Sequence, residues 1–99
     1  MAKPPREMIE IENVLHPGKT YRVEAGKFAQ ARAALLKALP PASPGLTQTE
    51  MTKAMRAALP VEEFPGTTSS WWMKSAQLDL EAKGQIVREA GKPLRWRKA

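Results

Sequence analysis

The sequence contains no cysteine and only one histidine, His16, among its 99 residues. Disulfide bonds, thiolate metal sites and cysteine nucleophiles are therefore excluded, and a Ser-His-acid set would have to be built around His16. The motifs G-x-x-x-x-G-K-[ST] and G-x-G-x-x-G and the Cys/His spacings of metal sites are absent as well. We therefore expect a protein that is not an enzyme and that uses no metal and no cofactor.

Long apolar runs are also missing. No stretch approaches the roughly 18–20 apolar residues of a membrane span, so we expect no membrane partner. The start of the chain has no apolar region typical of a signal peptide, which together with the lack of cysteine predicts a cytoplasmic protein.

The length of the chain fits one domain, near the usual size of about 100–150 residues. Residues 1–7 contain Pro4-Pro5 and no apolar anchor, which predicts a flexible tail. We expect a single domain over residues 8–99.

Hydrophobic periodicity predicts the order of the elements. Residues 9–12 and 21–24 alternate apolar and polar on either side of Pro17-Gly18, which favours a hairpin or two short extended segments around a type II turn. A helix is expected over residues 25–39. A second begins at the capping box of Thr47 and Glu50, and a third runs from about residue 69 to Gly84, which supplies a left-handed cap.

Short extended segments complete the pattern. Residues 45–47 are expected to add a bridge to the sheet, and residues 85–89 and 94–97 form the two strands of a terminal hairpin. The sequence thus predicts an α+β fold: a winged-helix-like three-helix domain with a C-terminal β-hairpin wing and an N-terminal extended or hairpin segment. Helix-turn-helix folds of this kind most often contact DNA.

Positive charge is concentrated near the C-terminus. The net charge of the chain is +6. Residues 1–24 balance four lysines and arginines against four glutamates. Residues 85–99 carry five lysines and arginines against Glu89 alone, which gives this segment a net charge of +4. A clustered basic surface is typical of a polyanion binder, although cations on an edge strand also prevent strand-to-strand aggregation. The candidate residues for contacts with DNA phosphates are Lys74, Arg88, Lys92, Arg95, Arg97 and Lys98.

The third helix is apolar on two opposed sides. At about 100° per residue, Met73, Ala76 and Leu80 share one side. The nearly opposite side has Ser75 as its only polar member, whereas base edges are read by hydrogen-bonding side chains. Lys74 and Gln77 would reach a DNA groove from the flank of this helix. Asp79 and Glu81, in contrast, would repel phosphate.

The second apolar side requires a cover, which is the N-terminal hairpin, Trp96 of the wing or a second subunit. The alternative to a DNA-binding function is therefore a module for protein–protein interaction or homodimerisation. Its interface residues would be Trp71, Ser75, Leu78 and Ala82. A small-ligand pocket near Tyr21 and His16 is a third hypothesis, which no motif supports.

Distinctive strings occur at both ends of the chain. They are residues 9–14 (IEIENV), 16–23 (HPGKTYRV), 71–74 (WW-x-K), 78–84 (LDLEAKG) and 92–96 (KPLRW). In these strings nearly the whole chain resembles a small bacterial family of single-domain proteins of about this length, whose function is unknown. The resemblance implies a winged-helix-like fold and no binding residue. Residues 80–88 are also similar to the helix-to-wing junction of winged-helix transcription regulators, which implies a regulatory role.

Overall fold

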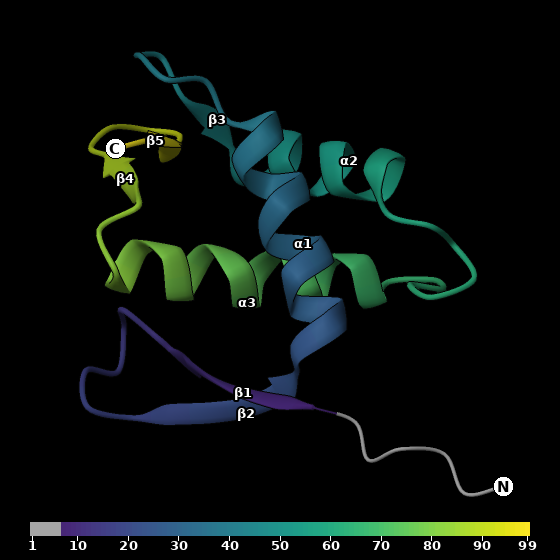
Figure 1. Ribbon diagram of the computed structural model, residues 1–99. Helices are drawn as coiled ribbons and strands as arrows, with labels where there is room; N and C mark the ends of the chain where they lie inside the picture. Colours follow the sequence, from purple (N-terminus) through teal and green to yellow (C-terminus); the bar gives the residue numbers. More distant parts are fainter. Residues whose placement is uncertain (1–6) are drawn as a thin grey trace, which may run out of the picture.

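The chain forms three helices and five short strands within residues 7–99, the part that the computed structural model describes (Figure 1). In chain order they are β1 (Met8–Glu12), β2 (Thr20–Glu24), α1 (Ala25–Ala38), β3 (Leu46–Thr47), α2 (Gln48–Ala58), α3 (Thr68–Ala82), β4 (Ile86–Glu89) and β5 (Arg95–Lys98). Of the predicted tail, residues 1–6 lie outside the described residues, and the carbonyl of Glu7 accepts a hydrogen bond from the Ala25 N–H at 2.9 Å.

The N-terminal segment is an antiparallel hairpin, one of the two predicted possibilities. Strands β1 and β2 pair in a register that places Ile9 opposite Val23 and Ile11 opposite Tyr21. Since directly opposed residues share a face, these four side chains form one apolar face of the hairpin. Gly18 has a φ of 86°, the left-handed conformation that the predicted turn requires.

The helices bury the predicted stripes. In α1 the buried side chains are Phe28, Ala31 and Leu35, and Leu39 follows at the C-cap. In α2 the buried side chains are Met51 and Met55, whereas Ala58 of the expected stripe is exposed. The capping box is present: the Glu50 N–H donates to Thr47 Oγ1 at 3.2 Å and the Thr47 N–H donates to Glu50 Oε1 at 2.9 Å.

Helix α3 ends as expected at Gly84, whose φ is 72°. The Gln85 N–H donates to the Leu80 carbonyl at 2.9 Å and the Gly84 N–H donates to the Glu81 carbonyl at 3.1 Å. This pair of bonds is a Schellman motif, which turns the chain sharply out of the helix and into β4.

The second sheet has the strand order β3-β5-β4, and both of its pairings are antiparallel. The predicted bridge of residues 45–47 is confirmed as β3, which pairs Leu46 with Trp96. Gly45 lies so close to β5 that a Cβ atom there would lie 2.9 Å from the Trp96 nitrogen and closer still to its carbonyl group. Glycine is required here by the close approach of two backbones.

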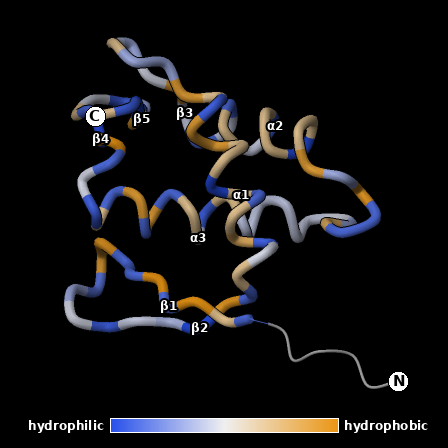
Figure 2. Tube along the Cα trace, viewed as in Figure 1, coloured by the Kyte–Doolittle hydropathy of each residue, from blue (hydrophilic) through white to orange (hydrophobic). Residues whose placement is uncertain are grey.

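The elements form layers with α3 in the middle. In Figure 1, α1 crosses α3, α2 lies on one side of α3 and the β1–β2 hairpin lies on the other. Figure 2 shows a hydrophobic stretch along β1, the strand that contacts α3. The predicted α+β class is confirmed, and the order of helices and strands fits a winged-helix-like domain with an added N-terminal hairpin.

Candidate functional site

The two faces of α3 have different neighbours, and only the core face is fully buried. Met73, Ala76 and Leu80 are buried in the core with α1 and α2. On the other side the Glu12 N–H of β1 donates to Asp79 Oδ1 at 2.8 Å, while Ile11 of β1 is buried. Of the covers left open by the sequence, the N-terminal hairpin lies beside the second apolar face, whereas Trp96 of the wing donates to Glu81 on a flank of α3 at 2.8 Å.

Two flank residues of α3 lie inside the protein, contrary to the prediction. Asp79 is 1% exposed and forms an ion pair with Lys83 at 2.9 Å, so it is not placed to repel phosphate. Gln77 is fully buried and donates to Glu81 Oε1 at 2.7 Å, so it cannot reach a DNA groove. The helix geometry places the two residues on opposite flanks. The hairpin contacts the flank of Asp79 through Glu12, and Trp96 of the wing contacts the flank of Gln77 through Glu81.

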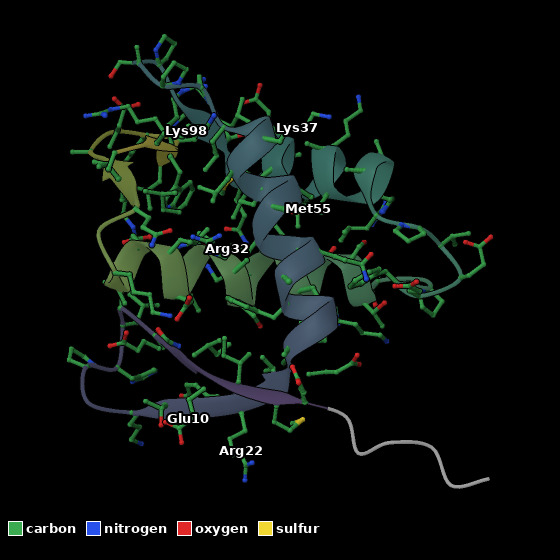
Figure 3. All side chains as sticks on the ribbon, in the orientation of Figure 1. Glu10, Arg22, Arg32, Lys37, Met55 and Lys98 are labelled. Atoms are coloured by element: carbon green, nitrogen blue, oxygen red, sulfur yellow. The ribbon has the colours of Figure 1, made fainter. Side chains whose placement is uncertain are left out.

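The hairpin leaves an open cleft beside α3. Its volume is about 340 Å³. Two aromatic residues of its lining are exposed: Trp71, with an exposed fraction of 55%, and Tyr21, with 44%. The lining residues are Ile11, Glu12, Asn13, Tyr21, Arg22, Val23, Trp71, Lys74, Ser75 and Leu78. In Figure 3 the Arg22 side chain points away from α3.

The cleft brings together three of the four predicted interface residues, Trp71, Ser75 and Leu78, and not Ala82. Trp71 packs edge-on against Trp72 with ring centroids 5.0 Å apart, and Trp72 packs in the same way on buried Phe64. The exposed tryptophan is therefore held by a row of rings that reaches the core.

The arginines of the wing are engaged in ion pairs within the domain. Arg88 Nε lies 3.1 Å from Glu81, Arg97 Nε lies 3.4 Å from Glu89, and Arg95 Nη1 lies 3.4 Å from Glu50. Each of these side chains thus has an intramolecular carboxylate partner that a DNA phosphate would have to replace.

Two of these carboxylates have lowered pKa values. Hydrogen bonds from the Ser43 hydroxyl and the Gly45 N–H, followed by the charge of Arg97, lower the pKa of Glu89 below its usual 4.5. The backbone N–H and the hydroxyl of Thr47 do the same for the pKa of Glu50. A lowered folded-state pKa stabilises the fold above the unfolded pKa and loses that effect as the pH falls through the folded value. Both carboxylates are therefore ionised at neutral pH.

Five of the six predicted nucleic-acid residues lie on the wing, and the sixth, Lys74, lies on α3. Three are the paired arginines, and Lys74 lines the cleft on the hairpin side of α3. Lys92 and Lys98 make no ion pair with any described residue, and Lys98 is joined to the end of α1 by its N–H, which donates to the Pro40 carbonyl at 2.9 Å.

Helix α2 has a polar face that was not predicted from the sequence. Five residues line an open hollow on the outside of this helix: Gln48, Thr49, Thr52, Lys53 and Arg56. The signal was available, because positions i, i+1, i+4, i+5 and i+8 share one side of a helix whose other side carries Met51 and Met55. We call these five residues the α2 polar face.

His16 lies in the exposed turn between β1 and β2, where its N–H donates to the Asn13 carbonyl at 2.9 Å. It is not among the residues lining the cleft. Residues 7–99 contain no group of three His, Cys, Asp or Glu side chains placed to hold a metal ion. None of their helices is long and apolar enough to span a bilayer.

Comparison with known proteins yields one match. Residues 8–96 match the sequence model of a family described as "Family of unknown function (DUF6958)". No curated protein and no solved structure matches the chain.

Proposed function

The chain belongs to this family of unknown function, and we propose that it is a non-enzymatic nucleic-acid-binding domain that holds duplex DNA through the phosphate backbone. The proposal depends on how charge is distributed over the fold. Residues 25–99 contain twelve lysines and arginines against six carboxylates, a net +6. Residues 7–24, which form the hairpin, contain two lysines and arginines against four carboxylates, a net charge of −2. The helices and the wing are therefore the cationic part of the molecule.

The single observation that carries the proposal is a surplus of unpaired cations. Four of the six carboxylates form ion pairs, and their partners are Lys83, Arg88, Arg95 and Arg97. Five further cations make no ion pair with a described residue and lie on the surface of α1, α2 and the wing: Lys37, Lys53, Arg56, Lys92 and Lys98. Phosphates neutralised by such side chains release counterions, which gives affinity without sequence information.

We expect the protein to bind a short fluorescein-labelled duplex of mixed sequence in an anisotropy titration at low salt. For three phosphate contacts the affinity should fall about 40-fold between roughly 50 and 200 mM salt, because the logarithm of the binding constant falls by about 0.9 per contact per decade of salt. A second duplex of unrelated sequence should bind equally. No binding at the lower salt would overturn the proposal.

The second candidate function is homodimerisation through the cleft. It is favoured by the 55% exposure of Trp71 and the 44% exposure of Tyr21, since tryptophan and tyrosine are the residues that most often dominate interface energetics. A second copy would cover both rings and the half-buried Leu78 of the same cleft.

For this candidate we expect the mass measured by sedimentation equilibrium to rise from monomer to dimer with protein concentration. Trp71→Ser should shift that rise to higher concentration, because it removes the largest exposed ring of the cleft. Val61→Ser is the matched control, since Val61 is 65% exposed and lies outside the cleft. A monomer mass that is independent of concentration excludes the dimer.

A further inference from the structure

We propose that the α2 polar face, and not α3, is the surface that lies against duplex DNA. This inference rests on the proposed function and adds the element that makes the contact. Lys53 and Arg56 would bind phosphates, and Gln48 and Thr49 would donate hydrogen bonds to phosphate oxygens or base edges, because these are the side-chain types that make such contacts.

The α2 polar face is accessible and has a uniform chemical character. Gln48, Thr49, Lys53 and Arg56 are exposed, and Thr52 is half-buried. The face contains no carboxylate; the one acid in α2, Glu50, is held by its own capping box and by Arg95. The charge of Lys53 and Arg56 is therefore not cancelled within the helix.

The helix beneath the face is firmly positioned. Met51 and Met55 are fully buried on the opposite side, and the capping box fixes the first turn. The Thr52 hydroxyl donates to the Gln48 carbonyl at 2.9 Å, which leaves its oxygen free to accept. The backbone of such a helix holds its outer residues in a fixed order along one side, as a groove or phosphate contact requires.

Helix α3 is a poor alternative because its outer side is occupied. The hairpin packs there through the hydrogen bond from Glu12 to Asp79, and it brings a net charge of −2 that would face phosphate. Figure 1 shows the hairpin and α2 on opposite sides of α3, so the acidic element is remote from the α2 polar face.

The wing is a weaker alternative for a different reason. Its three arginines each have a carboxylate partner, so only Lys92 and Lys98 remain unpaired there. These two lysines offer a control with the same loss of charge as Lys53 and Arg56 but on another element.

The test compares two double variants in the anisotropy titration over a series of salt concentrations. Lys53→Gln with Arg56→Gln should reduce the salt slope by about 2 and the affinity at low salt about tenfold, because two phosphate contacts are lost. Lys92→Gln with Lys98→Gln should change the affinity less than about threefold. Circular dichroism and urea unfolding should show that both variants remain folded, because Lys53, Arg56 and Lys92 are exposed and Lys98 is half-buried.

The outcomes separate this inference from the proposed function. If the wing variant loses as much affinity as the α2 variant, or more, the assignment to α2 is overturned while DNA binding stands. If the unmodified protein binds no DNA at low salt, both are overturned. A larger loss in the α2 variant, with the expected change in salt slope, supports the inference.

Discussion

Gly45→Ala is expected to destabilise the domain by about 3 kcal/mol or more, the upper part of the range for overpacking a close contact. The new methyl group would meet the Trp96 backbone, at 2.9 Å from its nitrogen and closer to its carbonyl. These are backbone atoms of β5, so no side-chain rotation relieves the clash. Strands β3 and β5 would have to separate.

Separation of these strands also disrupts hydrogen bonds that converge on Gly45. Its N–H donates to Glu89 Oε1 at 2.8 Å, and its carbonyl accepts from Arg95 Nη1 at 2.9 Å. Each such bond contributes about 1 kcal/mol, and more where one partner is charged. A domain of this size has a total stability of only about 5–15 kcal/mol, so the loss is a large fraction of it.

Urea unfolding monitored by circular dichroism measures this effect, and Gly26→Ala is the matched control. Gly26 lies near the start of α1, where a Cβ atom would make an ordinary contact at 3.4 Å with the Glu24 side chain. The same substitution should stabilise the domain there by about 0.5–1 kcal/mol, because alanine is the better helix former. If Gly45→Ala unfolds at the same urea concentration as the unmodified protein, then the backbones of β3 and β5 do not approach each other so closely at Gly45.

Local signals in the sequence were enough to predict the helices and strands of this fold. The capping box of Thr47 and Glu50, the glycine cap at Gly84 and the alternating residues on either side of Pro17-Gly18 each depend on neighbours a few positions apart. Such patterns report the backbone conformation directly, and the α+β class followed from their order.

The candidate site depended on contacts that no local pattern encodes. Glu12 and Asp79 are 67 positions apart, and Arg95 and Glu50 are 45 apart, so their pairing exists only once the hairpin and the wing have packed. For this reason a basic C-terminal third indicated a basic wing, whereas in the folded domain carboxylates of α2, α3 and β4 pair with its arginines. The α2 polar face was visible as helical spacing but was masked by the larger charge excess near the C-terminus.

Asp79→Ala is the second change with a large expected effect, a loss of about 2–3 kcal/mol of stability. Asp79 is 1% exposed and accepts both the Glu12 N–H at 2.8 Å and the Lys83 ammonium. Removal of a charged acceptor leaves the backbone N–H of β1 without its partner, and bonds to charged groups are worth about 1.5–3 kcal/mol. Lys83 is 37% exposed and regains water, so it adds little to the loss.

The expected structural consequence is a loosened hairpin. Hydrogen exchange of the peptide covering β1 and β2 should become faster in Asp79→Ala, while exchange in α1 and α2 should change little. Glu10→Ala is the control, because it removes the same charge from an exposed position on the outer face of β1 and should alter stability by less than about 0.5 kcal/mol. Unchanged exchange of the hairpin in Asp79→Ala would mean that Asp79 does not anchor it.

The same pair of variants also decides which helix contacts DNA. Loosening the hairpin uncovers α3 but leaves the α2 polar face as it is, and both variants raise the net charge by one. If the α2 polar face makes the contact, Asp79→Ala and Glu10→Ala should bind a duplex with equal affinity and equal salt slope. If α3 enters the groove instead, Asp79→Ala should bind more tightly than Glu10→Ala, since less free energy is then needed to displace the hairpin. We expect equal affinity, because the side of α3 beside the hairpin presents Trp71, Lys74, Ser75 and Leu78, in which Lys74 is the one cation that could contact a base edge or a phosphate.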